Sequence, residues 1–282
     1  MGLNATPVDL GRYGVWLNHQ VLDEDVAAEI ERLGFGALWL GGSTPADLEP
    51  AATALAATSR LAVATGIVNI WASPAEEVAD SFAGLESAYP GRFLLGLGAG
   101  HRELNGPDAV RPLQGMRDYL DVLDREGVPA DRRVLAALGP RMLGLSAERA
   151  AGAHPYLVTP AHARFARGLL GDGPLLAPEH KLVLGADPAR TRQEARRGMA
   201  FYLGMRNYAA NLERLGYTES DLVGEGSDAL IDDLVAQGGP DRVAAVLRSY
   251  LDAGADHVVA QPLPGECDLF GSLARLAPAL AS

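Results

Sequence analysis

Apolar residues along the chain gather into short runs separated by longer amphipathic segments. Tyr13–Leu17 and Ala37–Leu40 are compact apolar runs, and residues 61–70 form a β-branched run. Runs of this length predict buried strands of a parallel sheet. We interpret eight runs in this way, at residues 13–17, 37–40, 61–70, 92–101, 134–138, 154–159, 181–185 and 256–261.

The segments between these runs carry helical spacing and helix boundary signals. Val26, Ile30 and Leu33 recur at helical spacing before Gly34, which suits a helix C-terminus. Ser73-Pro-Ala-Glu76 predicts a capping box with proline at the first helical position.

Strands that alternate with helices predict a parallel sheet with helices outside it. Eight such units in 282 residues favour a closed (β/α)8 TIM barrel over a doubly wound sheet, and we assign residues 1–282 to a single α/β domain. Residues 188–254 are too many for one crossover helix, so they predict an extra helical segment between strands seven and eight. In such barrels the chemistry takes place at the carboxyl ends of the strands.

The composition narrows the class of partner. A formal net charge of -12 offers no broad basic surface to nucleic acid. Since no apolar run reaches membrane-spanning length and no signal peptide is recognisable, we expect a cytoplasmic protein with no membrane association. The single cysteine, Cys267, suits a reducing compartment. Met1–Thr6 fits the short N-myristoylation pattern, which we attribute to chance.

The residues that follow the predicted strands are mostly small, amide-bearing or aromatic. Such a lining suits a bulky planar cofactor that supplies the reactive atom itself. In strand order these residues are Asn18 and His19, Gly41–Ser43, Asn69 and Trp71, Gly98, Gly100 and His101, Gly139–Arg141, Thr159 and His162, and Gln261 and Glu266.

Other barrel chemistries fit this set of residues poorly. A Schiff base needs a lysine at the strand ends, but the only lysine, Lys181, begins the predicted seventh strand. The six histidines are scattered, without metal-ligand spacing, so we expect no metal site. A glycosidase needs two facing carboxylates, for which Glu103 and Glu266 are the obvious candidates, and this class is disfavoured rather than excluded.

Five segments, in order along the chain, resemble the luciferase-like superfamily of flavin- and deazaflavin-dependent barrels. They are most similar to actinobacterial oxidoreductases that use the deazaflavin coenzyme F420. The run from Tyr89-Pro-Gly-Arg-Phe93 into the glycines before His101 is the most specific of them. The five segments are ATGIVNI (64–70), AYPGRFLLGLGAGH (88–101), LAALGPRML (135–143), AGAHPYLVT (151–159) and GADHVV (254–259).

The resemblance implies roles for residues of the third and fourth strands. Gly66-Ile67 matches a non-proline cis peptide that backs the cofactor ring in deazaflavin members. Asn69 would bond the polar edge of the ring and Trp71 would shape the substrate side. The glycines of the fourth strand, Gly98 and Gly100, would let the ring approach the backbone.

A second set of implied roles concerns the proton and the cofactor phosphate. His101 would point into the pocket as the acid or base, with His19 as the second candidate. Gly139, Arg141 and Met142 would meet the cofactor phosphate, together with Thr159. Arg164 and Arg167 are further candidates for that phosphate.

Two departures limit the transfer of function. Members that oxidise sugar phosphates carry an Asp-His pair after strand two, where this chain has Gly41-Gly42-Ser43, so sugar-phosphate oxidation by that scheme is not expected. His101 also stands where those members carry a glutamate. The small-molecule substrate is not named by the sequence. A homodimer is suggested only by its frequency in the superfamily.

Three functions therefore remain open. The first is an F420-dependent oxidoreductase that transfers a hydride between the deazaflavin and a small organic substrate. The second keeps the fold but uses FMN, as a luciferase-like monooxygenase that activates oxygen. The third is a barrel that binds a ligand without turnover.

Overall fold

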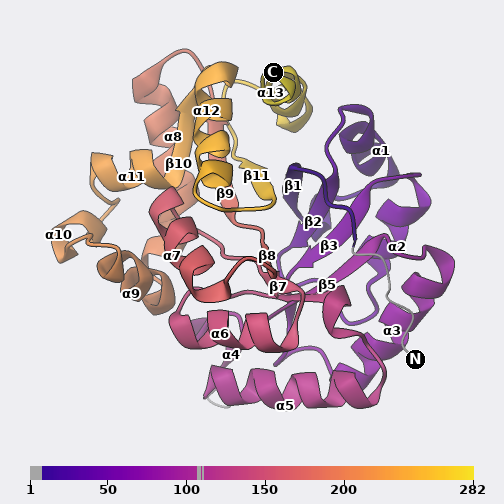
Figure 1. Cartoon of the computed structure of the whole chain (residues 1–282). Coiled ribbons are helices and arrows are strands. Elements are labelled where there is room, and N and C mark those ends of the chain that lie inside the picture. Colours follow the sequence, from indigo (N-terminus) through magenta and orange to yellow (C-terminus); the bar gives the residue numbers. More distant parts are fainter. Residues whose placement is uncertain (1–7, 107–108, 110) are drawn as a thin grey trace.

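The computed structural model describes residues 8–106, 109 and 111–282. The N-myristoylation pattern at residues 1–6 lies outside this part. Figure 1 shows parallel strands at the centre with helices around them. No helix in the described part is both long and apolar enough to cross a membrane.

Eight strand positions form a ring. The hydrogen-bonded order is β10-β9-β11-β1-β2-β3-β5-β6-β7-β8, with β4 paired to β5. Only Ala177 and Pro178 separate β8 from β9, and the connection bonds to both neighbours: Ala177 N donates to Ala153 O (2.9 Å) and Val259 N donates to Pro178 O (2.9 Å). The barrel therefore closes through β8 and β9, which together form the seventh strand. The strands are β1 (Tyr13–Asn18), β2 (Ala37–Gly41), β3 (Ala62–Gly66), β4 (Val68–Asn69), β5 (Phe93–Gly98), β6 (Arg133–Leu135), β7 (Gly152–Ala153), β8 (Leu175–Leu176), β9 (Glu179–Leu184), β10 (Val235–Gly238) and β11 (Val258–Pro262).

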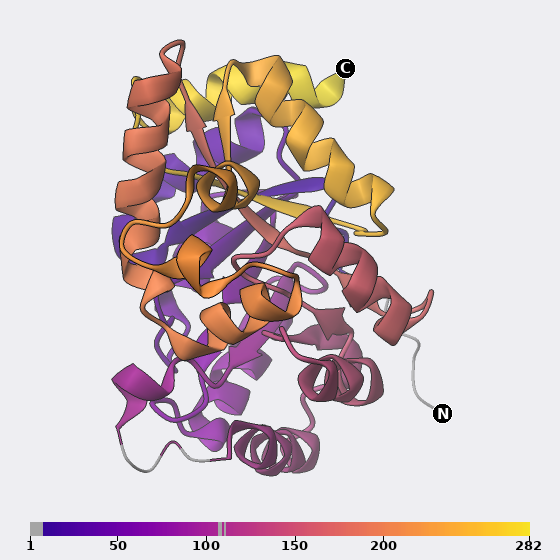
Figure 2. The same ribbon diagram turned by 90° about the vertical axis from the view of Figure 1, so that its left-hand side faces the viewer.

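The helices cover the outside of this ring and one of its ends. The expected extra segment between strands seven and eight is present, and Figure 2 shows its helices α9 to α11 in front of the strands. The α-helices are α1 (Glu24–Arg32), α2 (Glu49–Ala56), α3 (Ala75–Ala88), α4 (Arg102–Asn105), α5 (Pro112–Arg125), α6 (Pro140–Arg149), α7 (Pro160–Leu170), α8 (Pro188–Leu203), α9 (Arg206–Arg214), α10 (Glu219–Leu222), α11 (Asp228–Leu234), α12 (Pro240–Asp252) and α13 (Leu269–Ala281).

The predicted sixth strand, residues 154–159, was wrong: the strand is β7, which lies just before it, because the chain leaves the sheet after Ala153. Pro155 has no N–H to donate to a neighbouring strand. Leu157 adopts a left-handed backbone (φ 58°), and its N–H is bonded by the buried Glu179 carboxylate (3.0 Å) instead of a strand carbonyl. Residues 154–159 therefore form an irregular segment at the end of the barrel, where they are free to line a cavity.

Three further predictions about local structure were wrong. β10 (Val235–Gly238) lies within the stretch that we expected to be helical, and it pairs with β9. Lys181 is the third residue of β9 rather than the first of its strand. The capping box at Ser73 does not form: α3 begins at Ala75 with Pro74 as N-cap, and the Ser73 N–H already donates to Asn69 O (3.1 Å).

The interior of the barrel is closed by aromatic and imidazole rings. Trp39 is fully buried, and its ring stacks on His154 with a centroid distance of 4.2 Å. On the other side, Trp39 Nε1 donates to His257 Nε2 (3.1 Å). This layer forms a packed floor beneath the carboxyl ends of the strands.

Candidate functional site

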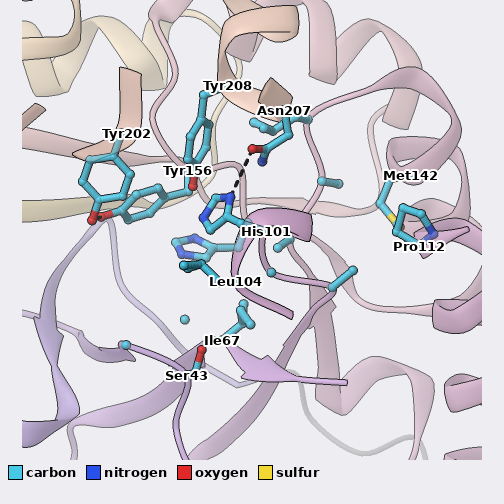
Figure 3. Close-up of a pocket in the computed structure, with 18 of the residues that line it drawn as sticks. Ser43, Ile67, His101, Leu104, Pro112, Met142, Tyr156, Tyr202, Asn207 and Tyr208 are labelled. Atoms are coloured by element: carbon cyan, nitrogen blue, oxygen red, sulfur yellow. Dashed lines mark hydrogen bonds between the residues drawn. The ribbon is translucent and has the colours of Figure 1, made fainter. Parts of the chain in front are cut away.

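A cavity of about 610 Å³ opens at the carboxyl ends of the strands, and Figure 3 shows the side chains around it. Ile67 and Ser43 lie on one side of it, and Tyr156, Tyr202 and Tyr208 lie on the opposite side. The cavity is lined by Trp16, Asn18, Gly42, Ser43, Gly66, Ile67, Ala99, Gly100, His101, Leu104, Pro112, Ala136, Ala137, Leu138, Gly139, Met142, His154, Tyr156, Phe201, Tyr202, Asn207 and Tyr208.

The first side, which we call the glycine wall, consists of Gly42, Ser43, Gly66 and Ile67. The peptide bond between Gly66 and Ile67 is cis, as the resemblance implied. A Cβ atom at Gly66 would lie 3.1 Å from Trp16 Nε1 and 3.2 Å from His154 Nε2, which is tighter than ordinary contact. A side chain at position 66 would crowd Trp16 and His154. Glycine instead leaves the backbone exposed to the cavity at this point.

The opposite side, which we call the tyrosine wall, consists of Tyr156, Tyr202 and Tyr208. Tyr202 and Tyr208 come from α8 and α9, in the segment inserted between strands seven and eight. The hydroxyl groups of Tyr156 and Tyr202 are 2.8 Å apart, and Tyr156 donates to Gln261 Oε1 (2.8 Å). Because these bonds fix the rings, the wall presents a rigid aromatic surface to the cavity.

A buried ion pair lies behind the tyrosine wall. Lys181 Nζ is 3.8 Å from the centroid of the Tyr156 ring and 3.0 Å from Glu179 Oε1, and both charged side chains are fully buried. Burial lowers the pKa of Lys181, and the Glu179 carboxylate opposes that shift. Lys181 thus supports the aromatic wall and is not itself in the lining.

His101 faces the cavity from the end of β5. Its Nδ1 lies 3.1 Å from Asn207 Oδ1, and its ring is 5.1 Å from that of Tyr208. Because an amide oxygen only accepts, Nδ1 carries the hydrogen and the neutral ring keeps its lone pair on Nε2. Nε2 has no hydrogen bond within the described residues, so it can serve a ligand in the cavity.

His154 is a second imidazole at the cavity, and it was not among the predicted site residues. Its Nδ1 lies 2.7 Å from Ala177 O, and Nε2 is buried without a hydrogen-bond partner in the described part. Burial lowers its pKa to about 4, although the bond to Ala177 opposes that shift. This histidine is therefore neutral at physiological pH.

The structure brings six of the predicted site residues to this cavity. The other six have different surroundings. His19, the second acid–base candidate, bonds through Nδ1 to Gly41 O (2.9 Å) and lies outside the lining. The six in the lining are Gly66, Ile67, Gly100, His101, Gly139 and Met142.

Three of the remaining residues support the cavity from behind. Asn69 donates to Asn105 Oδ1 (2.7 Å), and Trp71 Nε1 donates to Ala99 O (3.0 Å). A Cβ atom at Gly98 would lie 2.7 Å from Ile67 Cγ1, so this glycine makes room for the Ile67 side chain rather than for a ligand. These contacts fix the loop after β5.

The predicted phosphate ligands lie in two places. Gly139 is the N-cap of α6 with no side-chain cap, and Arg141 is an exposed residue of the first turn of that helix. Thr159 caps α7 instead, accepting from His162 N (3.4 Å). Arg167 is bonded to Asp256 (2.6 Å) and to backbone carbonyls, so it is not available as a phosphate ligand.

Several lining residues were not predicted from the sequence. Tyr202, Asn207 and Tyr208 come from the inserted helices, about a hundred residues after His101 along the chain. Arg214, at the end of α9, is outside the lining, and its Nη2 lies 3.9 Å from a Cβ built at Gly139. The sequence signals these residues only through several aromatic residues in the predicted helical segment, residues 188–254, whose packing the sequence does not predict.

No group of three or more potential metal ligands occurs in the described ranges, 8–106, 109 and 111–282. The site therefore consists of a glycine wall, an aromatic wall and two imidazoles, His101 and His154, whose Nε2 atoms have no hydrogen bond in the described part of the chain.

Comparisons with known proteins agree with this geometry. Residues 20–126 match the family model of luciferase-like monooxygenases. No protein of curated function matches the sequence.

Solved structures resemble nearly the whole chain. The coenzyme F420-dependent tetrahydromethanopterin reductase of Methanopyrus kandleri has a TM-score of 0.78 at 18% identity, over 98% of this chain and 99% of its own. An F420-dependent secondary alcohol dehydrogenase has a TM-score of 0.74 at 14% identity, over 95% and 98%. The oxygenating constituent of 3,6-diketocamphane monooxygenase from Pseudomonas putida, in complex with FMN, has a TM-score of 0.65 at 15% identity, over 96% and 98%. Together these matches confirm that the chain resembles the luciferase-like superfamily and has its barrel fold.

Proposed function

We propose that the protein is an oxidoreductase that holds coenzyme F420 in the cavity and transfers a hydride between this deazaflavin and a small organic substrate. The observation that carries the proposal is an open cavity between two unlike walls at the carboxyl ends of the strands. One wall exposes backbone, and the other exposes aromatic rings.

The residues present fit a planar tricyclic cofactor. A cavity of about 610 Å³ is within the range of cofactor sites. Gly66 exposes backbone where a Cβ would crowd Trp16 and His154, so a flat ring can lie against this wall. On this proposal Gly66 and Ile67 back the ring, and Gly100 leaves the loop after β5 close to its edge.

The anionic part of the cofactor needs positive partners in a chain with a net charge of -12. The N-terminus of α6 has no side-chain cap and presents the N–H groups of Gly139, which lines the cavity, and of Arg141, whereas Pro140 between them has none. Arg141 is in the first turn of that helix, and Arg214 approaches Gly139 from α9. We propose that these groups hold the phosphate, with Met142 packed beside them.

When bound in its reduced form, a deazaflavin supplies a hydride to an electrophilic carbon. The protein's own contribution is to position the substrate and to move a proton. Asn207 orients the His101 ring through Nδ1, which leaves Nε2 as the atom that holds or releases the proton. The tyrosine wall excludes water from that side of the cavity.

Two observations favour the deazaflavin. The two F420-dependent neighbours have TM-scores of 0.78 and 0.74, against 0.65 for the FMN-bound monooxygenase component. The segments that contain Gly66-Ile67 and His101 also resemble F420-dependent members. An FMN-dependent monooxygenase is the second candidate, because the family model over residues 20–126 describes luciferase-like monooxygenases. A barrel without turnover loses support, since the cavity is open and contains a free imidazole nitrogen.

The test compares the two cofactors and two histidines. Purified protein is titrated with oxidised F420 and with FMN, and oxygen consumption is followed with each reduced cofactor. We expect tighter binding of F420 and no cofactor-dependent oxygen uptake. Tight FMN binding with oxygen uptake would instead establish the monooxygenase. Reaction rates of two variants are then compared with a substrate that the protein converts. We expect His101→Gln to slow the reaction. His19→Gln, which changes a residue outside the lining, is the matched control.

A further inference from the structure

The cavity has no charged side chain among its described lining residues. None of the 22 residues that line it is an aspartate, glutamate, lysine or arginine. Away from the N-terminus of α6, where we place the cofactor phosphate, a charged ligand group buried in this cavity would lose its hydration without gaining a counter-ion, which is costly. The lining therefore favours an uncharged substrate.

The buried ion pair behind the tyrosine wall does not change this conclusion. Lys181 lies against Tyr156, but its charge is matched by Glu179 at 3.0 Å. Glu179 also accepts a bond from Leu157 N (3.0 Å). The pair is internally neutralised, so it offers no net charge to a ligand in the cavity.

Two of the exposed residues at the mouth of the cavity are large and apolar. Leu104 on α4 and Phe201 on α8 both line it, yet these residues are 62% and 53% exposed. Exposed apolar residues are ordinary when scattered, but these two border the same cavity from segments far apart in sequence. The centroid of the Phe201 ring lies 5.3 Å from that of Tyr202, so Phe201 extends the aromatic surface of the tyrosine wall towards solvent.

Two polar groups beside the tyrosine wall have no partner within the described residues. Asn207 uses Oδ1 to accept from His101, which leaves its amide N–H groups free. Nε2 of His101 is free too, and it becomes a donor when the ring is protonated. Both groups suit a ligand oxygen that accepts hydrogen bonds, such as a carbonyl.

From these observations we propose that the substrate is an uncharged, planar, mainly apolar ketone, whose body lies against the tyrosine wall and whose oxygen meets His101 and Asn207. This inference rests on the proposed function. In the reduction, the carbonyl carbon gains a hydride with its two electrons, the carbonyl oxygen gains the proton from His101 Nε2, and a secondary alcohol forms. The two electrons come from the reduced deazaflavin of the proposed function, which is oxidised and releases one proton to solvent, and the His101 ring takes up one proton from solvent, so charge and atoms balance.

The test uses a matched pair of probes with the F420-loaded protein. 2-Acetylnaphthalene is neutral, whereas 6-acetyl-2-naphthoate has the same rings and ketone with a carboxylate added. Dissociation constants are measured by calorimetry with oxidised F420 bound, so that no turnover is needed. We expect the neutral ketone to bind at least tenfold more tightly. Equal affinities, tighter binding of the naphthoate, or no binding of either probe would overturn the inference.

Single lysine substitutions locate the effect. Leu104→Lys and Phe201→Lys place a cation at the mouth, at exposed positions where folding is not at risk, and each should reduce the preference at least threefold in favour of the naphthoate. Val223→Lys is the control, because Val223 is 65% exposed and is not in the lining. An equal effect of all three would contradict the placement of the substrate.

F420 binding is measured first in every variant. Its absence in the unmodified protein would refute the proposed function, whereas normal F420 binding with a failed probe test would refute only this inference.

Discussion

Acidification should destabilise the fold through buried histidines. Burial lowers the pKa of His154 and His257 to about 4 and that of His180 to about 3. Each of these rings is about 1% exposed. In the unfolded chain a histidine has a pKa of about 6.5, so the unfolded state takes up protons first.

The sign and size of the effect follow from this difference. The stability that neutral histidines contribute is complete above about pH 6.5 and is lost as the pH falls from there towards about 4. At pH 5.5 each ring costs between about 1 and 2 kcal/mol, so the three together cost about 4 kcal/mol relative to pH 7.5. That is a large part of the 5–15 kcal/mol that is typical of the stability of a domain.

The assay is urea unfolding followed by circular dichroism at pH 7.5, 6.5 and 5.5. We expect the free energy of unfolding to fall by about 4 kcal/mol with an unchanged m-value. His154→Asn keeps a donor for Ala177 O and should remove about one third of the pH dependence. A free energy of unfolding that stays constant within about 1 kcal/mol from pH 7.5 to 5.5 would refute the reasoning.

Three further predictions concern the cavity and its support. His101→Gln should lower the turnover number about 10²- to 10⁴-fold with F420 affinity nearly unchanged, as measured by steady-state kinetics and titration; an unchanged rate would exclude His101 as the acid or base. Gly66→Val should weaken F420 binding at least tenfold, whereas Gly84→Ala, which enters open space on α3, should not; equal affinities would remove Gly66 from the ring site. Lys181→Met should destabilise the fold by about 3–5 kcal/mol in urea, because Glu179 is left buried without its cation, and adding Glu179→Gln should recover part of the loss; a stability equal to that of the unmodified protein would mean that the pair contributes nothing.

The parts of the fold that depend on local signals could be predicted from the sequence. The strand at 93–98 is preceded by Tyr89-Pro90-Gly91, which ends the helix before it, and its apolar run is continuous. The first three strands could also be predicted because each has a continuous apolar run. The long stretch after residue 188 was recognised as more than one helix by its length alone.

Other features depend on contacts between distant residues. The sixth strand ends early because the Glu179 side chain takes the N–H of Leu157, a contact across 22 residues. β10 has only two buried residues, Val235 and Ala236, so its apolar signal is too short to separate it from α11. Neither feature has a local pattern.

The site divides in the same way. Gly100 and His101 follow a strand directly, so their place in the cavity could be expected. Asn207 and Tyr208 reach the cavity only because α9 folds over the barrel end. Asn69 and Trp71 follow the third strand as predicted, but their polar groups bond to the loop after β5 and not to the cavity.

The most direct test of the account is a crystal structure of the protein with F420 bound. The account predicts the deazaflavin ring between the Gly66-Ile67 backbone and the tyrosine wall, with the phosphate at Gly139 and Arg214 and with His101 beside the open face of the ring. A ring bound elsewhere, or a cavity that stays free of F420 at saturating concentration, would contradict it.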